Sequence, residues 1–289
     1  MKMRLTCLSL LRGSILCQFP KYSYGSFPAA IQRGVPHFQR FSPRAYTSAA
    51  MDVPRPLDPA TRHIYYMHKT RNYGKWGWVF YRCTYNNDEE WNSFKRLISE
   101  EMHNDMVADN TPDIYRPVSD SLALTFFEDK DKFDGVSRDQ LRTHFQRWAV
   151  DAYPAENPRA KYNFDPEMAP PPRYRYFVQI DEESLRSIID DPNNAQGMMR
   201  RWGYVNYVDG WWKSLSEAYA ENQDPQLKED IEGELEEGYE PIDGCLEGNV
   251  GWMMLDTIDM SPSFYHYIWG FPEETWYLCY QRPPGIASW

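Results

Sequence analysis

The sequence predicts an α+β fold: a mostly antiparallel sheet with helices on one face, built from ferredoxin-like βαβ units around an aromatic-rich core. Six segments are rich in aromatic and β-branched residues, as strands are. Between them lie segments whose apolar residues recur every three or four positions, as in amphipathic helices. The 11 Trp, 21 Tyr and 14 Phe among 289 residues supply enough large apolar side chains for a buried core.

The first 46 residues differ in composition from the rest. They contain seven Lys and Arg and no acid, whereas the remaining 24 bases and 42 acids give a net charge of −18. A basic, Ser-containing segment without acids is typical of a mitochondrial presequence, which predicts a protein of the mitochondrial matrix. The alternatives are a secretory signal, or a translation start at Met51 that would leave the protein in the cytoplasm. In each case we expect residues 1–50 to be a disordered leader outside the fold.

Residues 62–152 are expected to form a half with the order βαβα. Its strands are predicted at 76–84 and 122–127, where aromatic and branched residues gather. Asn87 can cap the first helix, and Ser137 with Gln140 has the spacing of a capping box at the start of the second. The two apolar stripes consist of Trp91, Phe94, Ile98 and Met102, and of Leu141, Phe145, Trp148 and Ala152.

A Pro-rich connector at 153–172 separates this half from residues 173–289. The second half has the pattern βαββαβ of a ferredoxin-like unit, with strands expected at 174–180, 204–208, 252–258 and 276–281. Its helices are predicted to begin after Asp181 and at Ser261-Pro262. An acidic insert at 221–240 holds nine acids and one base, and we expect a solvated, mobile loop there. The pattern leaves open whether the two halves share one sheet.

Several classes of function lack their sequence signals. No run of about 18 uncharged apolar residues is present, so no membrane insertion is expected. The chain has no H-E-x-x-H or C-x-x-C metal motif and no G-x-S-x-G motif of a serine nucleophile. It also lacks both glycine-rich nucleotide-binding motifs, G-x-x-x-x-G-K-[ST] and G-x-G-x-x-G. Cys83 and Cys279 fall inside predicted strands, where a thiol is most often an inert apolar group. We therefore predict no metal, no cofactor and no catalytic residue.

One segment is weakly similar to a nucleic-acid-binding motif. Residues 75–81, Lys-Trp-Gly-Trp-Val-Phe-Tyr, resemble the RNP1 motif of the RNA-recognition-motif family, which implies that Trp76 and Trp78 stack on bases. Arg173 and Arg175 would add one basic edge. The net charge of −18 after residue 46 repels phosphate, so nucleic acid is a disfavoured partner. The competing interpretation is that both indoles are core aromatics beneath helices.

Two further groups of residues are candidates for a site. Trp211 and Trp212 are adjacent, and because neighbours on a strand point to opposite sides, one of them is expected to be exposed. An exposed Trp can anchor a partner. Asp243, Asp256 and Asp259 are the acids that an enzyme without a recognisable motif would use near a loop-lined cleft.

Four stretches carry a wider resemblance. They are 72–85 with Gly-Lys-Trp-Gly-Trp, 173–189 with Tyr-Arg-Tyr-Phe, 239–252 with Glu-Pro-Ile-Asp-Gly-Cys, and 276–285 with Arg-Pro-Pro-Gly. Together they resemble an uncharacterised protein family of filamentous fungi, over most of residues 70–285. The resemblance implies no activity and no catalytic residue, because none is assigned to that family.

The sequence therefore favours a non-catalytic α+β protein that binds a protein or a small ligand through an aromatic-lined surface. The binding residues predicted for it are Trp76, Trp78, Arg173, Arg175, Trp211 and Trp212. Its acidic charge favours a basic or neutral partner. The alternatives are an enzyme lacking a recognisable motif and a single-stranded RNA-binding protein that uses Trp76 and Trp78.

Overall fold

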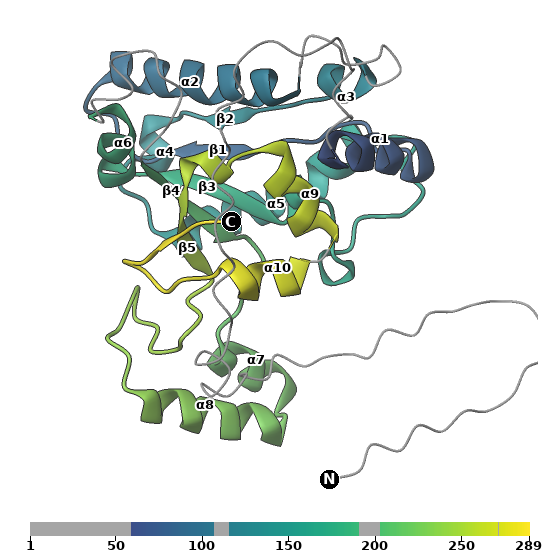
Figure 1. The fold of residues 1–289 in the computed structure, drawn as a ribbon. Coiled ribbons are helices and arrows are strands. Elements are labelled where there is room, and N and C mark those ends of the chain that lie inside the picture. The colour runs from purple at the N-terminus through teal and green to yellow at the C-terminus, as the bar shows by residue number, and fades with distance from the viewer. Residues whose placement is uncertain (1–58, 107–115, 191–202, 271) are drawn as a thin grey trace, which may run out of the picture.

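A computed structural model describes residues 59–106, 116–190, 203–270 and 272–289 (Figure 1). The expected leader at 1–50 lies outside these residues. Both halves of the chain contribute to one six-stranded sheet, in the order β2-β1-β3-β4-β5-β6. Its strands are β1 (Val79–Arg82), β2 (Thr125–Phe127), β3 (Tyr176–Ile180), β4 (Tyr204–Asp209), β5 (Trp252–Asp256) and β6 (Ile286–Ala287).

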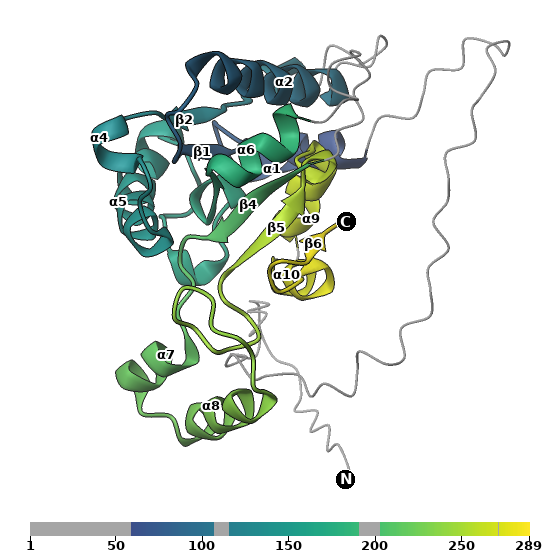
Figure 2. The same ribbon diagram turned by 90° about the vertical axis from the view of Figure 1, so that its left-hand side faces the viewer.

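Helices cover both faces of this sheet (Figure 2). The described helices are α1 (Pro59–Arg71), α2 (Asp88–Met106), α3 (Arg116–Asp120), α4 (Lys130–Phe133), α5 (Arg138–Glu156), α6 (Glu182–Ile189), α7 (Leu215–Asn222), α8 (Pro225–Glu237), α9 (Pro262–Gly270) and α10 (Pro272–Cys279). The predicted α+β class and aromatic core are thus confirmed, whereas the prediction of helices on one face is wrong. Strands β1, β3 and β4 are buried at every residue, as strands covered on both faces are.

The two faces of β1 illustrate the two halves of the core. Trp78 and Phe80 pack in a cluster with side chains of α1, α2, α6, α9 and α10. Val79 and Tyr81 point to the opposite face, because successive residues alternate along a strand, and pack with Phe145 and other side chains of α4 and α5.

The sheet is mixed rather than mostly antiparallel. Strand β1 pairs in parallel with both β2 and β3, and β5 pairs in parallel with β6. The pairs β3–β4 and β4–β5 are antiparallel. Parallel neighbours need a crossover connection that returns the chain to the same end of the sheet, and the helices between β1 and β3 and between β5 and β6 provide it.

The ferredoxin-like arrangement of the second half is also wrong. A split βαβ unit needs parallel strands on either side of its helix, but β3 and β4 flank α6 and are adjacent and antiparallel. The strand predicted at 276–281 is instead largely α10, and the last strand, β6, lies further on. Trp276, Cys279 and Tyr280 have the three- and four-residue spacing of a helix face, and they pack together against the core.

Local capping signals were predicted more accurately than the pairing of strands. The side chain of Asn87 accepts bonds from the amides of Glu89 and Glu90 at the start of α2. Ser137 and Gln140 form the predicted capping box of α5, and Asp181 caps α6. These signals depend on residues three positions apart, so the surrounding fold does not change them.

The acidic insert contains a helix where a loop was predicted. Asp224 caps α8, Pro225 occupies its first turn, and Gly238 ends it in the left-handed conformation. Helices α7 and α8 project from the body of the protein on the side of α10 (Figures 1 and 2). Only Leu227 is buried in this hairpin, which matches the expected solvation.

Among the described residues, no helix is both long and apolar enough to cross a bilayer.

Candidate functional site

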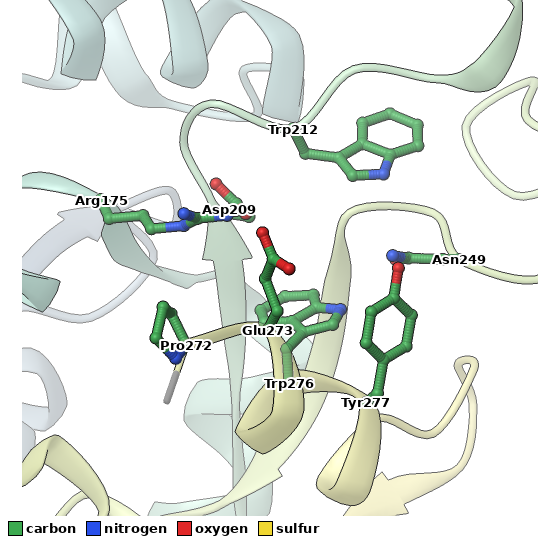
Figure 3. A pocket seen from close by; sticks show the side chains of 8 residues that line it. All are labelled: Arg175, Asp209, Trp212, Asn249, Pro272, Glu273, Trp276 and Tyr277. Carbon is green, nitrogen blue, oxygen red and sulfur yellow. Dashed lines mark hydrogen bonds and ion pairs between the residues drawn. The ribbon is translucent and has the colours of Figure 1, made fainter. Parts of the chain in front are cut away.

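A shallow hollow lies where the ends of β3 and β4 approach α10 (Figure 3). Four parts of the chain contribute to it: the entry to β3, the end of β4 with the following loop, the loop before β5, and the first turns of α10. It is lined by Arg175, Asp209, Trp212, Asn249, Pro272, Glu273, Trp276 and Tyr277. The space among these side chains is about 280 Å³, part of it open solvent, and the cavity that a water molecule can enter is only about 10 Å³. That cavity has room for about one water molecule.

Arg175 and Asp209 form one wall of the hollow. The backbone pairing of Tyr176 with Asp209 brings them together from the start of β3 and the end of β4. Nη2 of Arg175 lies 3.1 Å from Oδ2 of Asp209, and the side chains are only 11% and 7% exposed. The other carboxylate oxygen of Asp209 accepts a bond from the amide of Trp211. Both carboxylate oxygens of Asp209 are therefore already bonded within the protein.

Trp212 forms the opposite side of the hollow and is held there by two neighbours. Gly251 has a φ of +72°, and a Cβ at this position would come within 2.2 Å of the indole. The guanidinium of Arg142 lies over the same ring, 5.0 Å from its centroid. Arg142 also donates bonds to the carbonyls of Asp209 and Gly251, so it ties the ends of β4 and β5 together beneath Trp212.

Helix α10 supplies the third side. Glu273, Trp276 and Tyr277 are three and four residues apart, so one face of the helix presents all three. Trp276 is buried and stacks on Tyr176, with ring centroids 5.7 Å apart and an 8° angle between the planes. Glu273 and Tyr277 are exposed. In Figure 3 the carboxylate of Glu273 and the hydroxyl of Tyr277 point from α10 toward the side where Trp212 lies.

The charges around the hollow do not cancel. Its lining contains one cation, Arg175, and two carboxylates, Asp209 and Glu273. Nearby, Lys213 pairs with Glu221 and Arg142 pairs with Asp139. Among the described residues, no cation forms an ion pair with Glu273. The hollow therefore combines two indoles and a phenol with one exposed carboxylate that the described cations leave uncompensated.

The structure places the six predicted binding residues in different surroundings. Trp76 and Trp78 have no exposed surface, and the indole of Trp76 donates to the carbonyl of Val118. They are the core aromatics of the competing interpretation and lack the open faces on which a base could stack. RNA binding through these two indoles therefore has no structural basis.

Arg173 and Trp211 also have structural roles. Arg173 is 1% exposed and forms an ion pair with Glu156. The indole of Trp211 donates to the carbonyl of Tyr174. Of the predicted binding residues, only Arg175 and Trp212 line the hollow, and sequence reasoning missed the other members: Asp209, Asn249, Pro272, Glu273, Trp276 and Tyr277.

The thiols and imidazoles that could support catalysis lie elsewhere. Burial and the nearby Asp181 raise the pKa of the Cys83 thiol to about 12, and burial raises that of Cys279 to about 12. Burial also lowers the pKa of His63 and of His68 to about 4. Among the described residues, no three His, Cys, Asp or Glu side chains are grouped closely enough to hold a metal ion.

The three acids considered for an enzyme do not line the hollow. Asp243 pairs with Arg138 at the start of α5. Asp256 caps the short turn after β5, and the carboxylate of Asp259 accepts a bond from the amide of Trp289. Each of these three carboxylates therefore forms an ion pair or a hydrogen bond within the fold.

Compared with known proteins, the chain matches no protein-family model, no curated protein and no solved structure, so the resemblance to a fungal family stays a prediction.

Proposed function

We propose that this protein is a non-catalytic binding protein that engages a partner protein through the aromatic hollow beside α10. The observation that carries the proposal is that three aromatic residues, Trp212, Trp276 and Tyr277, share one hollow with polar side chains, and that the lining comes from four parts of the chain. Aromatic residues are enriched at protein interfaces because they bury a large apolar area and keep a polar tip for hydrogen bonding.

The size of the hollow favours a protein partner over a small ligand. Sites for small molecules are typically cavities of roughly 300–1,000 Å³ that bury most of the ligand. The cavity that a water molecule can enter here is about 10 Å³. The open part of the hollow, within the total space of about 280 Å³, suits the tip of one side chain, presented by a partner whose other contacts lie around the rim.

The chemistry of the lining supports binding rather than catalysis. It includes no Ser, Cys, His or Lys, and its possible acid–base groups are Asp209, Glu273 and Tyr277. Its most buried carboxylate, Asp209, already accepts bonds from Arg175 and Trp211. An enzyme without a recognisable motif remains the alternative, because two carboxylates do line the same hollow.

A paired capture experiment tests the proposal. Tyr277 is 46% exposed and lines the hollow, whereas Tyr66 is 61% exposed on α1 and does not. Tyr277→Ala and Tyr66→Ala remove the same ring, so we expect the first to lose a protein that the wild type and the second retain from an extract of the native source. Quantitative mass spectrometry of the captured material is the measurement. Capture that is equal for all three proteins, or no capture above a blank resin, would contradict the proposal.

A further inference from the structure

The hollow has the charge of a site for a cation. Arg175 lies within hydrogen-bond distance of Asp209, which leaves Glu273 as the carboxylate without a cation among the described residues. Glu273 is exposed, so a group of the partner can reach its carboxylate. A positive group that enters beside Glu273 would be attracted by its carboxylate. The π faces of the neighbouring indole and phenol rings would add to this attraction.

The surroundings extend this preference beyond the hollow. The chain passes from Trp212 directly into the projecting hairpin of α7 and α8, and residues 221–240 hold nine acids against Lys228. Figures 1 and 2 place the hairpin on the same side of the body as α10. A partner seated in the hollow therefore meets a strongly negative surface next to it, and complementary charge both steers association and selects the partner.

We infer that the hollow receives an arginine side chain from a basic segment of the partner protein. This inference rests on the proposed function and specifies the chemistry of its partner. A planar guanidinium can stack on an aromatic ring while it donates two parallel bonds to a carboxylate, which suits a shallow site lined by indoles and by Glu273. The flanking basic residues of the segment face the acidic hairpin.

Nuclear magnetic resonance of the full chain tests this directly. The indole N–H signals of Trp212 and Trp276, assigned by substitution to Phe, are followed during titration with N-acetyl-arginine amide. N-acetyl-citrulline amide is the matched probe, because citrulline has the same shape without the charge. We expect saturable shifts of both signals with the arginine probe, and at least about fivefold weaker binding of the citrulline probe.

Two neighbouring residues give a matched pair of variants. Glu273 and Glu274 are both exposed in the first turn of α10, but only Glu273 lines the hollow. Glu273→Gln should weaken the arginine probe about fivefold, and Glu274→Gln should leave its affinity unchanged. Both variants lose one acid of the same helix turn, so a difference between them reports the site and not the net charge.

The outcomes separate this inference from the proposed function. Equal affinity for the two probes, an equal effect of both variants, or no shift of either indole would overturn the inference. Capture of a partner that depends on Tyr277 would leave the proposed function standing in each of those cases. If sedimentation shows that the wild type self-associates and Glu273→Gln does not, the occupant is a second copy of this chain, and the inference of a separate partner is wrong.

Discussion

Arg173 makes its hydrogen bonds to other residues of the chain, although it was predicted to bind a partner. Its guanidinium donates to both carboxylate oxygens of Glu156, to the carbonyl of Ala123 and to the hydroxyl of Thr125, at 2.7–2.8 Å. Burial by itself would raise the pKa of the Glu156 carboxyl, but the bonds from Arg173 and Tyr174 outweigh it and lower the pKa below 4.5. The pair thereby ties the end of α5 to the entry of β3.

Glu156→Gln should therefore destabilise the fold. Removing one partner of a buried pair leaves the other charge uncompensated, and we expect a loss of about 2–3 kcal/mol in the free energy of unfolding, since Glu156 is partly exposed. Because the pKa is lowered by folding, this stabilisation is present above pH 4.5 and is lost as the pH falls through the folded value. Urea unfolding at pH 7 and pH 3.5 measures both effects. Glu167→Gln, at an exposed acid, is the control and should change little.

Gly251 is the residue on which the position of Trp212 depends. Gly251→Ala would place a Cβ within 2.2 Å of the indole, so the ring must move away from the hollow. Gly244 also has a positive φ, +82°, but a Cβ there meets no atom within 4 Å. Both substitutions carry backbone strain of about 1–2 kcal/mol, whereas only Gly251→Ala should shift the Trp212 indole signal and abolish binding at the hollow. Similar losses in both variants would show that strain alone is responsible.

At the scale of elements, the sequence predicted helix starts well and strand partners poorly. Asn87, Ser137 and Asp181 act within one turn, so their roles could be recognised without the fold. Helix α10 was mistaken for a strand because its aromatic residues are the types enriched in strands. Trp276 and Cys279 have helical spacing, but the segment is too short for that periodicity to decide between the two.

The candidate site could be predicted only in part for a related reason. Arg175 and Trp212 stood out as a basic residue next to aromatics and as one of two adjacent indoles. Asp209 and Glu273 are acids at the ends of elements, where acids are common. They became recognisable as site residues only when the pairing of β3 with β4 and the packing of α10 brought them together from 64 positions apart in the sequence.

The contact between α1 and α9 should respond to acid. The imidazoles of His63 and His266 are 4.1 Å apart, centroid to centroid, and burial, with a smaller effect of His266, lowers the pKa of His63 to about 4 from 6.5. The unfolded chain therefore binds a proton at this residue between pH 6.5 and 4 that the folded protein does not. Stability must fall as the pH decreases through this window.

His63→Gln should make that decrease smaller. We expect the wild type to lose on the order of 1 kcal/mol more than the variant between pH 7 and pH 5, a figure reduced for the partial exposure of the ring. His68, whose pKa is also lowered by burial, retains its own contribution in both proteins. Urea unfolding at the two pH values is the measurement, and His103→Gln, at an exposed His of α2, is the control. A variant as acid-sensitive as the wild type would refute the assignment.

At the scale of the whole molecule, stability is distributed unevenly. The strands β1, β3 and β4 are buried at every residue. The hairpin of α7 and α8 projects from this body, no side chain of α7 is buried, and Leu227 is the single buried residue of α8. The acids of the hairpin repel one another and keep it solvated. The chain thus combines a well-buried body that positions the hollow with an appended acidic surface that contributes little to the core.

Hydrogen exchange should resolve these two parts. Regions with few buried contacts open locally, whereas amides of the core exchange only when the whole domain unfolds. We expect amides of α7 and α8 to exchange at least about tenfold faster than those of β4, measured by mass spectrometry of peptic peptides. Glu156→Gln lowers the global stability, so it should speed exchange in β4 and leave the hairpin unchanged, because the hairpin opens without the core. If the variant accelerated both regions by the same factor, α7 and α8 would unfold together with the sheet, and the acidic surface would be an integral part of the cooperative domain.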